Sequence, residues 1–130
     1  MKKKPKKPSI PLLKRKLDKA FSEFIRRRDE PNGCITCGVR KPWKEMHCGH
    51  WLSRSYTAIR WNEANCWGQC PQCNVFCHGK PDEFWLAMEK KIGRGTMDIL
   101  LALRLKPYKL MRSDLLELIE IYTQKIKALP

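Results

Sequence analysis

Acidic residues are scarce in this sequence. Its 130 residues include 13 Asp and Glu against 27 Lys and Arg, so the formal net charge at pH 7 is +14. A chain this basic attracts polyanions, and it binds nucleic acid by releasing counterions from the phosphates. The imbalance favours a nucleic-acid partner and disfavours a purely structural, protein-binding domain.

Long apolar runs are missing as well. No stretch approaches the roughly 18 apolar residues that are needed to span a bilayer. The basic start of the chain is not followed by the apolar core of a signal peptide. We therefore expect no membrane partner and a cytoplasmic location, and at this length we expect one domain.

Cysteine is abundant, with seven residues, and in a reducing compartment such residues are more often metal ligands than disulfides. Cys34-x-x-Cys37 and Cys70-x-x-Cys73 have the spacing of two zinc knuckles, which turn all four thiolates onto one tetrahedral ion. We predict that these four residues hold a structural zinc.

Three cysteines remain outside this set. We expect Cys48, Cys66 and Cys77 to be small buried side chains, which is the common role of a free cysteine. A ligand set that uses Cys48 or Cys77 together with His78 is possible but less regular.

Composition and periodicity predict an α+β fold, in which N- and C-terminal helices flank a zinc-bound core. Prolines and like charges predict a disordered basic arm, and the remainder predicts a single domain. The predicted segments are the arm at residues 1–10 and the domain at 11–130, which comprises a basic helix at 11–29, a zinc core at 30–80 and a helical C-terminal part at 81–130.

Within these segments we predict individual elements. Short β-like runs occur at Met46–Ser53 and Ala58–Trp61, and a short segment after Cys70 ends at Gly79. Helices are expected at about 82–92, 96–105 and 113–128, the last with Ser113 as its N-cap.

The zinc core also contains residues suited to phosphodiester hydrolysis. His50, Asn65 and Asn74 occur in an order similar to that of HNH (ββα-metal) nucleases, which place a treble-clef zinc fold around one catalytic cation. An imidazole can deprotonate water, and an Asn can orient that imidazole. We predict that His50, Asn65 and Asn74 are catalytic, and that Asn74, His78 and His47 hold a catalytic Mg²⁺ or Mn²⁺.

Basic residues outside this core are candidates for contacts to phosphates. We expect Arg54 and Arg60, which lie near the predicted base, to clamp the scissile phosphate. The other predicted DNA-binding residues are Lys2, Lys3, Lys4, Lys6, Lys7, Lys14, Arg15, Arg26 and Arg27.

These motifs together resemble a known family, the lambdoid phage NinG (Rap) recombination proteins. The resemblance covers roughly residues 12–93, and its carrying segments are Ala20–Asp29, Gly33–Gly38, Gly49–Arg54, Arg60–Asn65 and Gln69–Asn74 with Gly79. It implies a metal-dependent endonuclease that cuts branched recombination intermediates, namely Holliday junctions and D-loops, in the bacterial host of a phage or prophage. Because a symmetric junction needs two cuts, a homodimer is expected.

One departure concerns the catalytic metal. The chain is also similar to phage endonuclease VII, in which the residue before the base His is an acidic metal ligand, whereas here it is Gly49. The missing ligand is then His47, His78, Asp29 or water. A second departure is Lys80, where related sequences tend to have Asn.

Two other interpretations remain open. One is a zinc-stapled, branched-DNA-binding protein without catalysis, and the other is an HNH nicking nuclease with another DNA task. The apolar stripe Leu115, Ile119, Tyr122 and Ile126 could form the dimer interface or pack in the chain's own core.

Overall fold

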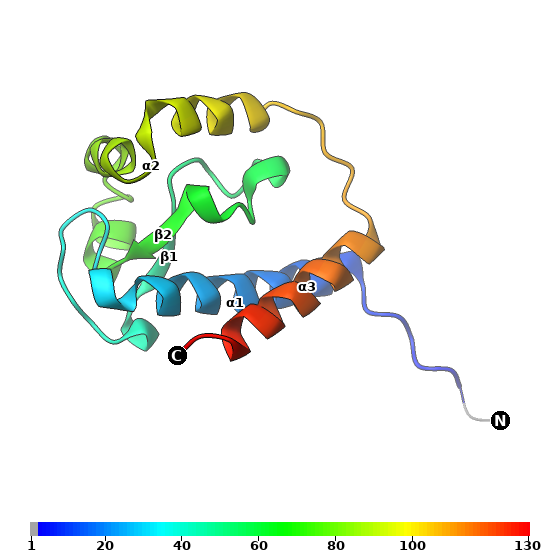
Figure 1. Cartoon of the computed structure of the whole chain (residues 1–130). Coiled ribbons are helices and arrows are strands. Elements are labelled where there is room, and N and C mark those ends of the chain that lie inside the picture. The colour runs from blue at the N-terminus through cyan, green and yellow to red at the C-terminus, as the bar shows by residue number, and fades with distance from the viewer. Residues whose placement is uncertain (1–2) are drawn as a thin grey trace.

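A long N-terminal helix forms the base of the molecule in the computed structural model, which describes residues 3–130 (Figure 1). Helix α1 spans Ile10–Asp29 and begins at Ser9, whose hydroxyl accepts a hydrogen bond from the Leu12 N–H at 3.3 Å. Residues 3–9 precede it as an exposed segment without helix or strand. Lys2, a predicted phosphate contact, lies outside the described residues.

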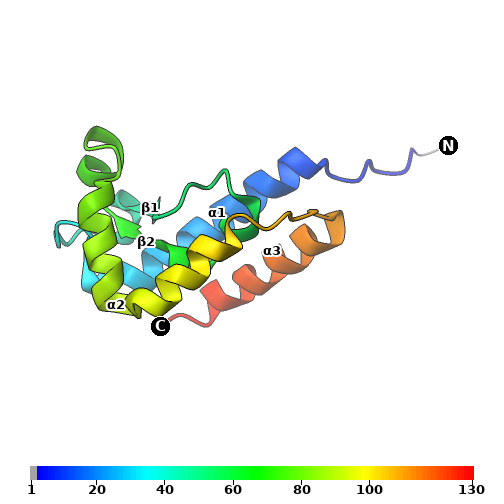
Figure 2. The same cartoon turned by 90° about the horizontal axis from the view of Figure 1, so that it is seen from above.

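The C-terminal helix packs along α1, and the two lie side by side in Figures 1 and 2. Helix α3 spans Arg112–Lys127 and buries Leu115 and Tyr122 in this contact. The Tyr122 ring meets the Phe21 ring edge-on, with centroids 4.9 Å apart. The apolar stripe of the last helix therefore belongs to the chain's own core, which settles one of the open alternatives.

The N-cap of α3 lies two residues before the predicted one. Ser113 was expected as its N-cap, but the helix begins at Arg112 and Met111 is the N-cap. The Met111 N–H donates to the carboxylate of Asp114, the third residue of the helix, at 3.0 Å, so an acidic side chain of the first turn satisfies the amide of the N-cap residue.

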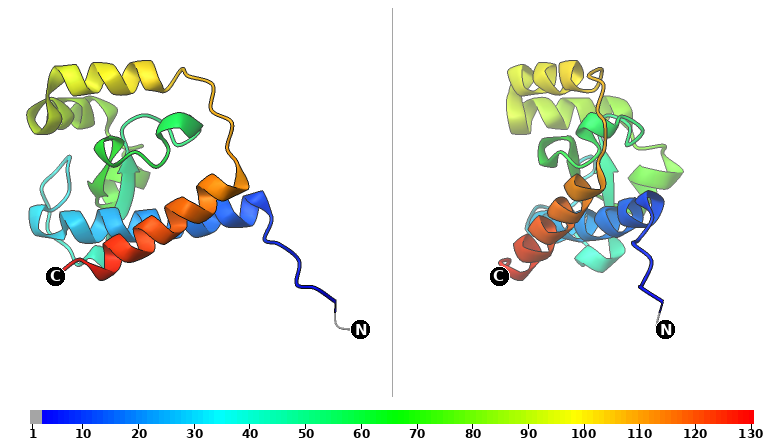
Figure 3. Two further views of the ribbon diagram at one scale, coloured as in Figure 1. Left: turned by 45° about the vertical axis from the view of Figure 1, so that its right-hand side comes forward. Right: turned by 90° about the vertical axis from the view of Figure 1, so that its right-hand side faces the viewer.

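A two-stranded antiparallel sheet lies between α1 and α2 (Figures 1 and 3). Strand β1, His47–His50, pairs with β2, Cys66–Gln69, so that His47 faces Gln69 and His50 faces Cys66. The predicted β-like run at 46–53 contains β1. The prediction of a β-like run at Ala58–Trp61 was wrong, because Thr57–Ile59 forms a 3₁₀ turn that buries Ile59.

Helix α2, Pro81–Leu103, covers the other side of the sheet, as the views in Figure 3 show. It bends at Gly93, whose φ of 80° and ψ of 160° are not helical. Its two halves correspond to the two helices predicted at 82–92 and 96–105. Within residues 3–130 no helix is long and apolar enough to cross a membrane.

The helices and the small sheet together confirm the mixed α and β class. Two apolar clusters hold the layers together, one between α1 and α3 and one beneath α2. The second cluster consists of Leu52, Ile59, Phe84, Met88, Met97 and Leu100. The sheet and its loops are thus fixed from both sides.

The contact between α1 and α3 can be tested with two adjacent leucines. Leu115 is 0% exposed and Leu116 is 49% exposed. We expect Leu115→Ala to lower the free energy of unfolding by about 2–5 kcal/mol, because it leaves a cavity, and Leu116→Ala to change it by less than about 1 kcal/mol. Urea denaturation of both variants measures this. Equal losses would show that α3 does not pack as described.

Candidate metal centre and histidine cleft

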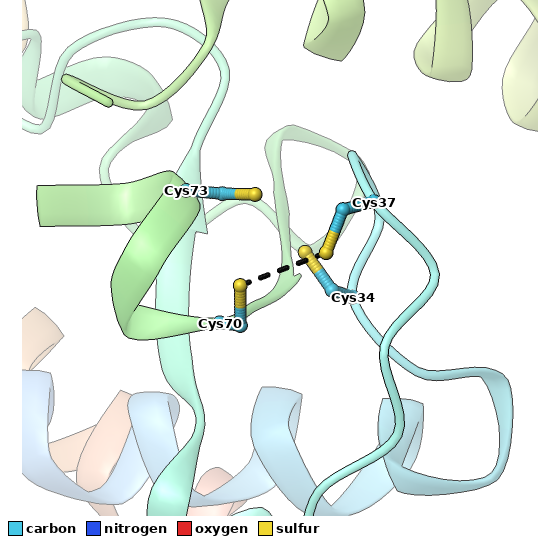
Figure 4. A group of neighbouring side chains, drawn as sticks. All are labelled: Cys34, Cys37, Cys70 and Cys73. Atoms are coloured by element: carbon cyan, nitrogen blue, oxygen red, sulfur yellow. Dashed lines mark hydrogen bonds between the residues drawn. The ribbon is translucent and has the colours of Figure 1, made fainter. Parts of the chain in front are cut away.

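Four cysteine side chains converge at one end of the sheet (Figure 4). Cys34 and Cys37 come from the loop after α1, and Cys70 and Cys73 come from the end of β2 and the π-helical turn Gln72–Phe76. Their four Sγ atoms all lie within 4.8 Å of one another, and the Sγ atoms of Cys37 and Cys70 are 3.7 Å apart.

This cluster fits a tetrahedral zinc ion. Thiolates at about 2.3 Å from a shared zinc are separated by about 3.8 Å, close to the Cys37–Cys70 distance. Burial would raise the pKa of Cys34, but hydrogen bonds from the Thr36 hydroxyl and nearby backbone amides outweigh it and lower the pKa to about 6. The predicted four-cysteine set is therefore assembled, and its chemistry is compatible with structural zinc.

Two of the remaining cysteines flank His50. Cys48, on β1, and Cys66, on β2, have Sγ atoms within 4.8 Å of each other and of a ring nitrogen of His50. Cys66 is fully buried, as predicted, and burial raises the pKa of its thiol. Cys48 and Cys77 are half-buried.

His50 lies at the end of β1 with one ring nitrogen anchored. Its Nε2 is 3.0 Å from the backbone carbonyl of Arg60. Since a carbonyl can only accept, Nε2 carries the proton and Nδ1 keeps a free lone pair. Burial lowers the pKa of His50 and outweighs the hydrogen bond to the Arg60 carbonyl, which acts in the opposite direction, while the charge of Arg54 lowers the pKa further. The imidazole is therefore neutral near pH 7, the form in which it can accept a proton.

A cleft of about 710 Å³, which we call the histidine cleft, opens between α1, β1 and the π-helical turn. It is lined by His47, His50, Asn74 and His78. The amide Nδ2 of Asn74 donates a hydrogen bond to Nδ1 of His47 at 3.0 Å, so Nδ1 of this ring is the unprotonated nitrogen. The structure thus brings four predicted site residues together, with the His47–Asn74 pair in direct contact.

Gly49 lies on β1 between these histidines, at the position where the similarity to endonuclease VII leads one to expect an acidic residue. A Cβ atom there would lie 2.6 Å from Oε1 of Gln69 and 3.2 Å from the Phe84 ring. The backbone approaches these buried side chains so closely that only glycine fits. A ligand from this position is therefore excluded by packing.

Asn65 does not face the cleft. Its side chain is 0% exposed, and both of its amide atoms bond the backbone of Leu52: Oδ1 accepts from the N–H at 2.9 Å and Nδ2 donates to the carbonyl at 3.0 Å. The prediction that Asn65 contacts the imidazole is corrected: it holds the loop after β1, and through that loop it positions His50.

Arg60 also differs from its predicted role. Its guanidinium forms a bidentate ion pair with Asp18 of α1, with Nε to Oδ1 at 3.1 Å, and Asp18 also accepts from Trp61 Nε1 at 2.9 Å. Asp18, and not a phosphate, is thus the partner that the structure gives this guanidinium. Arg54, in contrast, is exposed at the cleft rim and forms none of the ion pairs present in residues 3–130.

Asp29, one of the alternatives for the missing metal ligand, is buried elsewhere. Its carboxylate accepts from Arg28 at 2.7 Å and from the Gly68 N–H at 2.8 Å. It therefore joins α1 to β2 and does not reach the histidine cleft.

The other predicted phosphate contacts follow α1 and the arm. Arg26 lines the cleft, Lys14 and Arg27 are half-buried and Arg15 is exposed. In the arm, Lys3, Lys4, Lys6 and Lys7 are exposed.

The cleft also contains residues that the sequence did not single out. Lys19, Ser22 and Lys44 contribute to its wall, and Asp18 anchors Arg60. Helical spacing from Arg26 places Lys19 and Ser22 on one side of α1, and this was an available signal. Lys44 comes from a loop turn, for which the sequence gives no such signal.

The zinc that copurifies with the chain should depend on the four clustered cysteines. We expect about one zinc per purified chain, loss of that zinc in Cys70→Ala, and its retention in Cys77→Ala, because Cys77 lies outside the cluster. Elemental analysis of the folded proteins measures this. A zinc-free wild-type protein, or equal loss in Cys77→Ala, would contradict the assignment.

The role of Asn65 is testable through stability. We expect Asn65→Ala to lower the free energy of unfolding by about 2–4 kcal/mol, since it leaves a buried N–H and a buried carbonyl of Leu52 unpaired. Asn62→Ala is the matched control, because it removes one bond, to the Ala64 N–H, and should cost about 0.5–2 kcal/mol. If urea denaturation shows no larger loss of stability for Asn65→Ala than for Asn62→Ala, the two buried hydrogen bonds of Asn65 are not what holds this loop.

Comparison with known proteins gives one family. No curated protein and no solved structure matches the chain. A family model described as Bacteriophage Lambda NinG protein matches residues 1–130, which confirms the resemblance carried by the cysteine, histidine and asparagine motifs. The chain, with its four-cysteine cluster and its histidine cleft, belongs to the phage NinG recombination family.

Proposed function

We propose that this protein is a metal-dependent DNA endonuclease that cuts branched recombination intermediates. The observation that carries the proposal is His50, a neutral imidazole with one nitrogen anchored to the Arg60 carbonyl, facing a basic cleft that it shares with the His47–Asn74 pair. A treble-clef, ββα-metal core of the HNH type is also supported by three features, which are the strand pair, the turn after Cys73 and the cysteine cluster.

His50 is the proposed general base. Its Nδ1 lone pair accepts a proton from the attacking water, while the Arg60 carbonyl holds the Nε2 proton and keeps the ring in one tautomer. A positioned base of this kind contributes roughly 10²–10⁴-fold to rate. Asn65 contributes indirectly, because it fixes the loop that follows His50.

Asn74, His78 and His47 are the proposed residues for a catalytic cation. Mg²⁺ or Mn²⁺ bound there would stabilise the charge that develops on the phosphate and on the leaving oxygen. When Asn74 Nδ2 donates to His47, its Oδ1 is free to face the cation and His47 positions the amide. With the amide turned over, Oδ1 would accept from Nδ1–H, and the Nε2 lone pair of His47 would be the free ligand.

The charge around the cleft supports a DNA substrate. Lys19, Arg26, Lys44 and Arg54 line it, and the exposed lysines of the arm extend this basic surface. Such side chains bind phosphates irrespective of base sequence, which suits recognition of a branched shape. We propose branched DNA as the partner, a homodimer as the cutting form, and the cytoplasm of the phage's bacterial host as the location.

Cleavage assays with His50 variants test this proposal. Wild type, His50→Ala and His50→Gln are incubated with labelled Holliday junctions, D-loops and linear duplex, in Mg²⁺, Mn²⁺ or EDTA. We expect metal-dependent cutting of the branched substrates, reduced at least about 10²-fold in both variants because the base is removed. Equal zinc content and equal DNA affinity are the controls.

The same assay separates catalysis from binding. Tight binding of junctions by the wild type, without cutting in any metal, would overturn the endonuclease and leave a zinc-stapled, non-catalytic branched-DNA-binding protein. Cutting of linear duplex at the same rate as junctions would instead indicate a nicking nuclease without branch preference.

A further inference from the structure

Three soft metal ligands meet on one face of the sheet, apart from the four-cysteine cluster. Cys48 and His50 alternate with His47 and Gly49 along β1 and so point to the opposite side of the strand. Cys66 is the direct cross-strand partner of His50. The two thiol sulfurs and an imidazole nitrogen all lie within 4.8 Å of one another, and this is the second such group in residues 3–130.

We propose that Cys48, His50 and Cys66 form a second metal site that takes a thiophilic divalent ion such as Zn²⁺. Zinc binds sulfur at about 2.3 Å and nitrogen at about 2.0 Å, so the ligand atoms around one ion are about 3.5–3.8 Å apart. Small shifts of the three side chains would bring their ligand atoms to these distances. Binding breaks two S–H bonds, releases both protons to solvent and forms two metal–thiolate bonds. The +2 charge of the ion is then neutralised by the two thiolates.

The ion has a route to this site and a vacant direction for a fourth ligand. Cys48 and His50 line the histidine cleft, whereas Cys66 lies behind them in the core. An ion that enters from the cleft meets the half-buried ligands first and keeps a water on its open side. The site is thus of the three-ligand, open kind, unlike the closed four-cysteine cluster.

The ligand chemistry separates this site from the proposed catalytic one. Two thiolates and an imidazole select zinc, cobalt or cadmium, while amide oxygen and imidazole in the cleft tolerate Mg²⁺ or Mn²⁺. In the tautomer that the Arg60 carbonyl holds, the lone pair that His50 offers an ion is on Nδ1. Binding through Nδ1 would occupy the lone pair assigned to the general base and would inhibit cleavage; this consequence, unlike the binding itself, rests on the proposed function.

Cobalt titration of the zinc-loaded protein tests the site directly. Co²⁺ binds such sites more weakly than Zn²⁺, so it leaves the four-cysteine zinc in place while reporting new thiolate ligands by charge-transfer absorbance. We expect uptake of about one further equivalent per chain. Cys48→Ala and Cys66→Ala should each weaken that uptake by more than about tenfold, and Cys77→Ala, the matched control thiol, should not.

A second arm measures the consequence for DNA cleavage. Zinc added beyond the first equivalent should inhibit Mg²⁺-dependent cutting by the wild type and by Cys77→Ala, and at least about tenfold more zinc should be needed for Cys48→Ala. No further cobalt uptake by the wild type, or uptake that survives both Cys48→Ala and Cys66→Ala, would overturn the site. If cobalt binds as expected but no variant cuts DNA, the endonuclease proposal fails and the metal site stands.

Discussion

The four-cysteine cluster is the constraint on which the rest of the molecule depends. It joins the loop at residues 34–37 to the turn at 70–73, and the strands and loops of the core lie in the chain between them. Asn74 directly follows Cys73, and its N–H donates to the Cys70 carbonyl at 2.9 Å. A turn that carries two of the clustered cysteines therefore fixes the backbone of a cleft residue, and zinc bound to the cluster would contribute to folding, because no such site exists in the unfolded chain.

Buried polar side chains extend this constraint through the core. Asn65 holds the loop after β1, Asp29 bonds β2, and Gln69 donates from Nε2 to the Thr36 hydroxyl at 3.1 Å and to the Gly79 carbonyl at 2.9 Å. Each replaces hydrogen bonds that so small a sheet cannot supply. Hydrogen bonds from buried side chains to the backbone therefore hold the core of this protein together with apolar packing.

Features that are local in sequence were predictable, and those that pair distant residues were not. Cysteine spacing and helical periodicity located the metal cluster and all three helices, since ligand geometry and a period of about 3.6 residues act within a few positions. The ion pair of Arg60 was not predicted because its partner, Asp18, lies 42 residues away. Asn65 was predicted to be catalytic, and its sequence position does not reveal that it bonds the backbone of Leu52.

His50 lies where two kinds of donor meet, and this gives the cleft its chemical character. On one side of β1 are the hard and borderline donors of Asn74 and His47, and on the other are the thiols of Cys48 and Cys66. The Arg60 carbonyl leaves His50 one lone pair, for which water and a soft ion would compete if both proposals hold. The ion that reaches the cleft would then decide which chemistry the imidazole supports, because the tautomer itself is held by the backbone.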